Sequence, residues 1–226
     1  PATANTINKL SHGIADNILT QTALAYTRKI IIAPAANTNM LFNPNTQSAI
    51  SHLISNDYTI IEPQEKLLAC GDTGSGALAE PIEVFYTTAK ALLKEPFWID
   101  REVVVTGGGS REKIDEVRYI SNFSSGKMAN ALSLALYLKG ANVTYISTMG
   151  FGNLPLDIKR VKVDCAEDIL QETQKSIASV TTQKDEPIPY LLMAAAVADF
   201  KPAVPKEGKV KKSSVGTHWN IELEQT

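Results

Sequence analysis

Apolar residues in the first ninety positions recur with helical and strand spacing. Two short apolar runs, at 29–34 and 58–62, predict strands, and the segment after Pro81 predicts a helix with proline in its first turn. One long amphipathic helix is predicted by four apolar residues on a common face: Ile7, Leu10, Ile14 and Ile18. The periodicity stops at EPFWID, residues 95–100, so we place a domain boundary between residues 95 and 96.

Residues 96–226 repeat this order more regularly. Strands are predicted at 102–106, 142–147, 159–163 and 190–197, and helices at 127–139 and 166–179. The strands are almost continuously apolar, which is typical of parallel strands covered on both faces. We therefore predict an α/β protein of two doubly wound three-layer domains, residues 1–95 and 96–226, with ligands bound at the carboxyl ends of the strands.

Composition and charge add limits to this picture. The 226 residues are 44% hydrophobic with a formal net charge of -2, so there is no broad basic field for nucleic acid or an anionic membrane. No run of about 18 apolar residues predicts a membrane span. The two cysteines, Cys70 and Cys165, are expected to be reduced thiols of a cytoplasmic protein. Because Pro1 begins inside a motif and IELEQT stops within a pattern, we expect a fragment.

Two glycine motifs fail as nucleotide fingerprints. In VVVTGGGSRE, Gly107 and Gly109 match the first two glycines of GxGxxG, but Glu112 stands at the third. SSGKMA resembles the end of a P-loop, but Ser121 stands where the P-loop has its first glycine, and Met128 stands where it has Ser or Thr. Neither a typical NAD site nor a P-loop is expected.

Three polar loops follow elements of the second half. RYISNFSSGKMA (118–129) leads into a helix and favours an anion, although Ser124 or Ser125 as a simple helix cap is an equal alternative. AAAVADFKP (194–202) ends a strand on Asp199 and Phe200, which an ordinary Asp turn also explains. KEGKVKKSS (206–214) is by itself a solvated loop. Together the three favour a polyphosphate site.

The first half has three such segments. PATANT precedes a helix and can cradle a phosphate, and Asn37 in APAANTNM follows a strand, where a capping role is the alternative. Cys70 lies in LLACGDTGSG, where the glycines predict a loop. A lone cysteine is more often a small buried apolar residue than a catalyst, but this glycine-rich setting favours chemistry.

Read in order, these segments resemble one family. PATANT, GIADN, PAANTNM, ACGDTGSG, TGGGSREKIDEVRYISNFSSGKM, AAAVADF and KVKK are similar to the bacterial bifunctional flavoproteins of coenzyme A biosynthesis, the CoaBC family. In these proteins phosphopantothenoylcysteine decarboxylase is fused to a CTP-dependent phosphopantothenate–cysteine ligase. The resemblance implies a partial flavoprotein-type decarboxylase domain in residues 1–95 and a partial Rossmann-like ligase domain in 96–226.

For the decarboxylase, the resemblance implies that Asn37 holds the substrate carboxylate and Cys70 donates a proton from a mobile loop. FMN would be bound by four residues: Thr3, Ala4, Asn5 and Thr6. Two positions depart from the family pattern, because Ala36 replaces a methionine and Ala77 an arginine. The family's N-terminal flavin-binding segment, with its histidine, is also missing.

For the ligase, the resemblance implies that phosphopantothenate is activated as an acyl-cytidylate, which cysteine then attacks. Asn122 would orient this intermediate, Lys209 would stabilise phosphoryl charge, and Mg²⁺ would bridge phosphates. The implied CTP site comprises Gly107, Gly108, Gly109, Ser124, Ser125, Gly126, Met193, Ala194, Ala195, Asp199, Phe200, Lys209 and Lys212.

The expected partners are therefore small molecules, 4'-phosphopantothenate, cysteine and CTP, together with further copies of the chain that complete sites between subunits. The alternative hypothesis is a regulatory homologue that binds FMN and a protein partner without turnover. Retention of Asn37, Cys70, Asn122 and Lys209 favours the enzyme.

Overall fold

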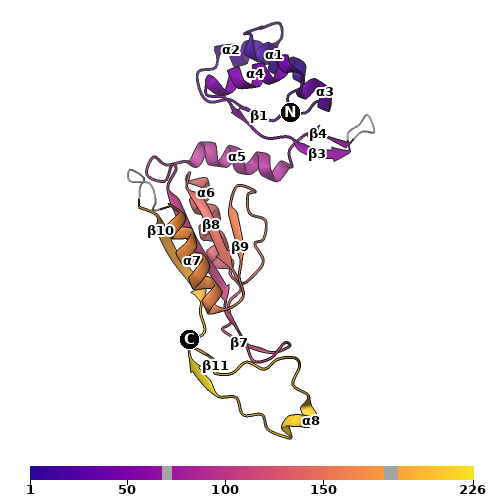
Figure 1. Cartoon of the computed structure of the whole chain (residues 1–226). Helices are drawn as coiled ribbons and strands as arrows, with labels where there is room; N and C mark the ends of the chain where they lie inside the picture. Colours follow the sequence, from indigo (N-terminus) through magenta and orange to yellow (C-terminus); the bar gives the residue numbers. More distant parts are fainter. Residues whose placement is uncertain (68–72, 181–187) are drawn as a thin grey trace. The chain divides into compact units, whose positions relative to one another are not determined.

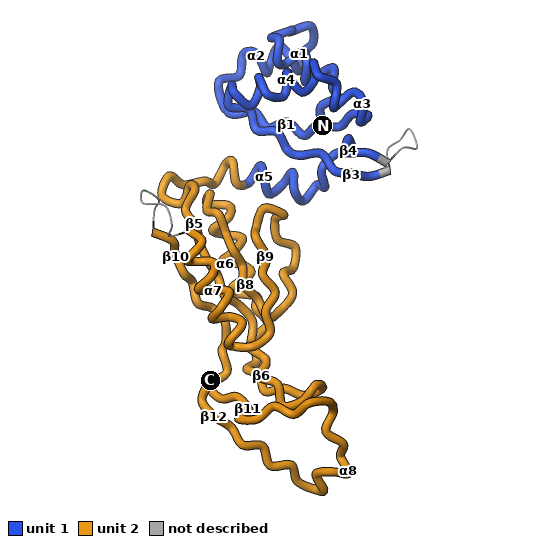
Figure 2. Tube along the Cα trace, viewed as in Figure 1, with its two compact units in different colours: residues 1–89 blue, residues 90–226 orange. Residues whose placement is uncertain are grey.

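The chain folds into two compact units, Pro1–Ala89 and Lys90–Thr226, in a computed structural model that describes residues 1–67, 73–180 and 188–226 (Figure 2). The division falls inside helix α5 (Pro81–Leu93). The domain boundary expected after this helix, and the domain assignments, stay predictions. We describe each unit by itself.

Unit 1 contains short parallel strands that pack against helices. β1 (Ile31–Ile32) pairs in parallel with β2 (Thr59–Ile60), and a parallel bridge joins Ala2 to Pro34. Its helices are α1 (Ala4–Ser11), α2 (Ile18–Ala25), α3 (Thr38–Leu41) and α4 (Pro44–Ser55) (Figure 1). Ile7, Ile32 and Leu53 form the core between α1, β1 and α4. The described residues thus show the predicted parallel pairing and two short sheets rather than one extended sheet.

The single long helix predicted near the N-terminus is wrong. α1 ends at Ser11, and Gly13 then has a φ of 66°, which an L-residue in a helix does not adopt. Asn17 starts α2 through a capping box with Thr20. As a result Ile7 is fully buried, whereas Ile18 is 80% exposed. The shared helical face of the sequence is therefore divided between two helices.

A hairpin follows β2 in unit 1. β3 (Gln64–Leu67) pairs antiparallel with β4 (Thr73–Ala77). The chain then enters α5 at Pro81, as predicted, since proline is well tolerated at the first helical position.

Unit 2 contains a four-stranded, fully parallel sheet. Its strands are β5 (Glu102–Gly109), β8 (Asn142–Ser147), β9 (Lys159–Lys162) and β10 (Tyr190–Ala196), in the order β10-β5-β8-β9. Two helices connect them, α6 (Lys127–Leu138) and α7 (Ala166–Val180) (Figure 1). The α/β class with a parallel sheet is confirmed, and each strand and helix predicted here lies where expected.

The two helices cover opposite faces of this sheet. Val104 and Ile146 pack with Ile169 of α7 in one core cluster. Gly107 lies three residues after Val104 in β5, and Tyr145 lies next to Ile146 in β8. Both are on the opposite face of the sheet, near Ala129 of α6. Because successive strand residues point to opposite faces, α6 and α7 form separate outer layers. The strand order reverses beside β5, since β8 lies on one side of it and β10 on the other.

Beyond the carboxyl ends of β5 and β10 the chain forms two small antiparallel sheets. β6 (Arg111–Lys113) pairs with β7 (Tyr119–Ser121), and β11 (Phe200–Pro202) pairs with β12 (Leu223–Gln225). The short helix α8 (Lys212–Val215) lies between β11 and β12 in the sequence. These elements carry several of the predicted site residues.

Candidate functional site

The carboxyl ends of β5 and β10 lie side by side and carry almost no side chain. Three pairs are in register here: Gly107 with Ala194, Gly108 with Ala195, and Gly109 with Ala196. In an open α/β sheet, ligands bind at the position where the strand order reverses. The pairing therefore places small residues of two strands side by side at this edge, with the glycines buried and the alanines half-buried.

Two of these glycines are required by packing. A Cβ at Gly107 would collide with the Cβ of Ala129 on α6 and with the Tyr145 ring. Gly108 has a φ of 88°, and a Cβ there would collide with the Thr148 hydroxyl. The glycines lie beyond the strand predicted at 102–106 but belong to β5, and they bring α6 close to it.

Asn122 reaches across this edge. Its Nδ2 donates a hydrogen bond of 2.9 Å to the carbonyl of Val197, directly after β10. Its own backbone carbonyl lies against Gly109. The structure therefore brings Asn122 together with the glycines of β5 and the end of β10, as the predicted site requires.

Ser110 completes the same edge and was missed by sequence analysis. Its backbone N–H donates to the Ala196 carbonyl over 3.2 Å, and its buried hydroxyl accepts from the Ala198 N–H over 3.0 Å. These contacts fix the turn after β10. A serine that directly follows a glycine-rich strand is the only signal that the sequence offers for this role.

The start of α6 has no side-chain cap. Its N-cap is Gly126 with a φ of 70°, and no side chain bonds to the first backbone N–H groups of the helix. The alternative in which Ser124 or Ser125 caps this helix is therefore wrong. Since the first turn also contains no acidic residue, the free N–H groups and the helix dipole favour an anion.

The start of α7 is closed by carboxylates. Glu112 accepts from the Ala166 N–H over 3.0 Å, and Asp168 accepts from the Asp164 and Cys165 N–H groups, each over 3.1 Å. The bond from Cys165 is the largest cause of the lowered pKa of Asp168, and burial raises the pKa of the Cys165 thiol. The bonds of Asp168 are local to the helix start, whereas Glu112 bonds a residue 54 positions away, and no sequence pattern indicates that contact.

The predicted basic loop lies on the β6–β7 hairpin. The Glu116 N–H donates to the Gly208 carbonyl over 3.4 Å, and the Val210 N–H donates to Asp115 over 3.2 Å. Lys209 thus lies in a loop bonded to this hairpin and Lys212 is the first residue of α8, and no described contact joins either lysine to Asn122 or the glycines. Hydrogen bonds do join the three loops, because Arg118 of the 118–129 loop donates to the Val210 carbonyl of the basic loop and Asn122 donates to the Val197 carbonyl.

The remaining residues of the predicted nucleotide site are divided. Ala194 and Ala195 lie at the sheet edge, and Met193 in the same strand is 70% exposed. Phe200 instead begins β11 and pairs with Gln225, while the Asp199 carbonyl accepts from the Thr226 N–H over 3.1 Å. Asp199 and Phe200 therefore lead into the small β11–β12 sheet.

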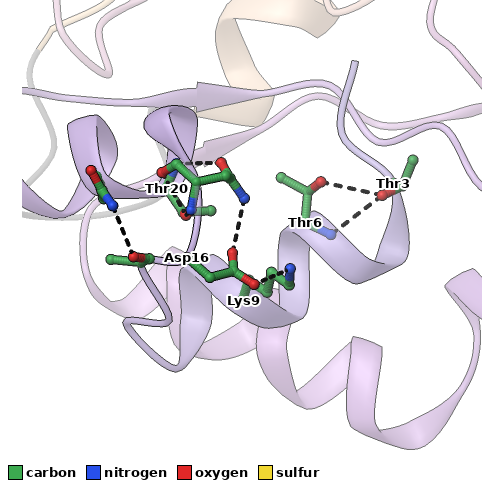
Figure 3. A network of polar contacts seen from close by, with 8 residues as sticks. Thr3, Thr6, Lys9, Asp16 and Thr20 are labelled. Carbon is green, nitrogen blue, oxygen red and sulfur yellow. Dashed lines mark hydrogen bonds and ion pairs between the residues drawn. The ribbon is translucent and has the colours of Figure 1, made fainter.

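In unit 1 the predicted FMN residues form the first turn of α1. Thr3 is the N-cap, and its hydroxyl accepts from the Thr6 N–H over 3.3 Å and lies 3.2 Å from the Thr6 hydroxyl (Figure 3). Ala4 is buried and Asn5 is exposed. An anion at this turn would have to share the Thr6 N–H with Thr3, so the fit to a flavin phosphate is partial.

The other end of α1 is fixed by a polar network. Lys9 forms an ion pair of 2.6 Å with Asp16, and Asn17 donates to the same carboxylate over 2.9 Å (Figure 3). The hydrogen bond from Lys9 is the largest cause of the lowered pKa of Asp16. This network ties α1 to the start of α2.

An apolar cavity of about 570 Å³ lies beside α1, α2 and β1. Its lining includes Thr6, Leu10, Tyr26 and Ile31. A planar heteroaromatic ring suits such apolar walls, and Thr6 connects the cavity to the predicted phosphate turn. The cavity supports the flavin assignment better than the capped turn does.

Asn37 is the N-cap of α3, and its side chain accepts from the Asn39 N–H over 2.9 Å. The preceding residue, Ala36, donates its N–H to the Gly76 carbonyl of β4 over 3.0 Å. Ala77 is the last residue of β4. The β3–β4 hairpin is thus anchored next to Asn37, whereas Cys70 lies outside the described residues.

The described residues contain neither a metal-binding cluster nor a membrane-spanning helix. Within residues 1–67, 73–180 and 188–226, no group of three or more His, Cys, Asp and Glu side chains is arranged to hold a metal ion. Among the described helices, none has the length and apolar character needed to cross a membrane.

Comparison with protein families assigns both halves of the chain. Residues 98–226 match the DNA/pantothenate metabolism flavoprotein C-terminal domain, and residues 1–93 match the flavoprotein family. The coenzyme A biosynthesis bifunctional protein CoaBC of Bacillus subtilis (strain 168) is 39% identical over 100% of this chain and 54% of its own length. A cysteine/cysteine sulfinic acid decarboxylase from an unknown prokaryotic organism is 38% identical over 95% of this chain and 59% of its length. The chain thus spans little more than half of these relatives.

Two solved structures are similar over parts of the chain. A PPC decarboxylase mutant complexed with pantothenoylaminoethenethiol is 41% identical over 39% of this chain and 50% of its own, with a TM-score of 0.38. The C-terminal domain of the bifunctional protein CoaBC is 32% identical over 57% of this chain and 56% of its own, with a TM-score of 0.44. The assignment rests on the sequence matches, which confirm the resemblance to CoaBC proteins. The chain belongs to the family of DNA/pantothenate metabolism flavoproteins.

Proposed function

We propose that this chain acts in coenzyme A biosynthesis, as part of a bifunctional decarboxylase and ligase. Residues 96–226 would contribute to CTP-dependent ligation of cysteine to 4'-phosphopantothenate. Residues 1–95 would contribute to FMN-dependent decarboxylation of the product, 4'-phosphopantothenoylcysteine, to 4'-phosphopantetheine. The relatives named CoaBC, similar across both halves of the chain, support this pair of activities.

The ligase half is supported by one observation above the others. The open edge of β5 and β10 lies beside an α6 start that has no side-chain cap and no acidic residue in its first turn. Such a helix start offers backbone N–H donors to a phosphate. The start of α7, which packs on the same sheet, differs in both respects, because a carboxylate bonds to it and its first turn contains acidic residues.

The proposed ligation has two balanced steps. A carboxylate oxygen of 4'-phosphopantothenate attacks the α-phosphorus of CTP, and the bond to the departing pyrophosphate breaks. The cysteine amine then attacks the acyl carbon, CMP leaves, and the amine proton passes to solvent. We assign the positioning of the acyl-cytidylate to Asn122 and the stabilisation of phosphoryl charge in the first step to Lys209.

In the decarboxylase half, bound FMN would supply the oxidation that activates the cysteinyl group for loss of carbon dioxide. Asn37 would hold the substrate carboxylate, and Cys70 would donate the proton to the product. The anchoring of the β3–β4 hairpin next to α3 supports a common site for these residues. We also propose assembly with further copies of the chain, whereas a purely regulatory role is not favoured by the enzyme relatives.

The ligase proposal is tested in the protein that contains this chain, with cysteine withheld. Asn122→Asp should still release pyrophosphate from CTP but fail to transfer the acyl group when cysteine is added. Lys209→Gln should slow pyrophosphate release by about 10²-fold, as loss of a transition-state donor does. Pyrophosphate release and labelled acyl-CMP are measured in parallel. Release at the normal rate in Lys209→Gln would remove this lysine from the mechanism.

The decarboxylase proposal is tested with Cys70→Ser, because a hydroxyl is a far weaker acid than a thiol. We expect FMN to remain bound, as seen in its absorbance, and an oxidised decarboxylated intermediate to accumulate in the mass spectrum. A normal yield of reduced product from this variant would exclude Cys70 as the proton donor.

A further inference from the structure

The basic loop that contains Lys209 is attached to the β6–β7 hairpin by three hydrogen bonds from three successive hairpin residues. The Lys206 N–H donates to the Ile114 carbonyl over 2.9 Å. The Glu116 N–H donates to the Gly208 carbonyl over 3.4 Å. Between these two hairpin residues, the Asp115 carboxylate accepts from the Val210 N–H over 3.2 Å. The other two bonds join backbone to backbone, so among these three residues Asp115 alone holds the loop through its side chain.

Asp115 is a fully occupied acceptor. Its Oδ1 accepts from the Val117 and Arg118 N–H groups over 2.8 and 2.7 Å, and its Oδ2 accepts from the Arg118 guanidinium over 2.7 Å as well as from Val210. The side chain is 0% exposed. Burial alone would raise its pKa, but the backbone donors and Arg118 outweigh burial and hold the pKa below its ordinary value. The carboxylate is therefore ionised at neutral pH.

Arg118 binds Val210 as well, through the backbone carbonyl of that residue. Both of its terminal nitrogens donate to the Val210 carbonyl over 3.4 Å, and its guanidinium lies 5.0 Å from the centre of the Trp219 ring. The N–H and the carbonyl of Val210 are thus both bound by one Asp–Arg pair. Val210 directly follows Lys209, so this pair fixes the backbone next to the lysine.

We infer that Asp115 is a positioning residue that, with Arg118, fixes the backbone at Val210 and thereby places the Lys209 ammonium for phosphoryl transfer. This role rests on the proposed function of Lys209. Asp115 itself has no free oxygen for a substrate, because both oxygens are already bonded. A second function of the pair, resistance of the loop to local opening, does not depend on the ligase reaction.

The informative variant is Asp115→Asn, which keeps the size of the side chain. Whichever way the amide is turned, its NH₂ group meets two N–H donors, so the contact with Val210 or the hairpin turn is lost. The control is Glu224→Gln, because Glu224 pairs with Lys201 over 3.6 Å in the β11–β12 sheet without contacting the loop. Folding of both variants is checked by circular dichroism.

The first measurement is limited trypsin digestion of the chain, with mass spectrometry of cleavage after Lys209 and Lys211. We expect Asp115→Asn to accelerate cleavage at these sites severalfold and Glu224→Gln to leave it unchanged, because local opening controls access. Equal cleavage in Asp115→Asn and the parent chain would overturn the inference, whether or not the ligase proposal holds.

The second measurement is a double-mutant cycle on pyrophosphate release in the protein that contains this chain. Asp115→Asn should reduce the rate by about tenfold or more, since small misplacement of a catalytic group is costly. In the Lys209→Gln background the same change should have almost no further effect. Additive losses would overturn the action through Lys209. If the parent protein releases no pyrophosphate, the proposed ligase function fails, and trypsin cleavage alone decides whether Asp115 holds the loop.

Discussion

The two helix starts of the unit 2 sheet differ in a way that separates structure from function. Both α6 and α7 pack on the same parallel sheet, where α7 follows β9 directly and α6 follows the β6–β7 hairpin after β5. The start of α7 is bonded by Glu112 and Asp168, whereas the start of α6 has Gly126 and no side-chain cap. Unsatisfied N–H groups at a helix start weaken a fold unless a partner is present. The proposed anion site at the start of α6 rests on this contrast.

The largest expected effect follows from Gly107→Ala, which tests the close approach of α6 to β5. The new methyl group collides with Ala129 and Tyr145, so the helix or strand must shift at a cost of roughly 1–3 kcal/mol. The free energy of unfolding in urea measures this loss. Gly150→Ala is the control, because a Cβ at Gly150 meets no atom within 4 Å. Equal stabilities of the two variants would contradict the packing argument.

A smaller effect is expected at the closed helix start. Glu112→Ala leaves the Ala166 N–H without its acceptor and should lower the free energy of unfolding by about 1–2 kcal/mol. Glu112→Gln retains an amide oxygen that can accept this bond and should recover most of the loss. The free energy of unfolding of both variants is again measured by urea titration. If both variants lose equal stability, the hydrogen bond is not the reason for the burial of Glu112.

At the open helix start, Ser124→Ala and Ser125→Ala should change stability by less than about 0.5 kcal/mol, because neither serine caps α6. Thermal and urea unfolding of each variant provide the measurement. A loss comparable to that of Glu112→Ala would show that α6 is capped after all, and the contrast between the two helix starts would disappear.

The smallest effect concerns the pH dependence of the α7 start. The pKa of Asp168 lies below its usual value of 3.8 in the folded chain, mainly because its carboxylate accepts from Cys165. Its stabilising contribution is therefore fully present above that value and is lost as the pH falls through the folded pKa. Asp168→Asn should reduce the difference in unfolding free energy between neutral pH and the acid side of this window. An unchanged difference would assign the acid sensitivity to other groups.

Sequence patterns predicted the regular elements of unit 2 because their causes are local. The strand at Asn142–Ser147 is a run of mostly apolar residues, and Gly140 with a φ of 109° follows the end of the preceding helix. In unit 1 the same reasoning gave one helix where there are two. The apolar spacing continues through Gly13, and only the backbone conformation of this glycine and the Asn17 cap divide it.

Residues expected at one edge of the sheet lie together there only where they are close in sequence to strand ends. Asn122 and Gly107 lie at the open edge because they border β5 or lead into α6. Lys209 was expected at the same edge, but its loop is held by Asp115, and that hydrogen bond joins residues 95 positions apart. No periodicity or composition encodes such a contact. The role of Cys70 stays a prediction.

The central claim, that the open start of α6 binds nucleotide phosphate, is tested most directly by titrating CTP with Mg²⁺ into isotope-labelled chain and following backbone amide shifts by NMR. We predict saturable shifts at Gly107–Gly109 and at the first turn of α6, Lys127–Asn130, with the Cys165–Asp168 amides of α7 unmoved. Shifts that concentrate at the start of α7, or no saturable shift at the start of α6, would contradict the claim.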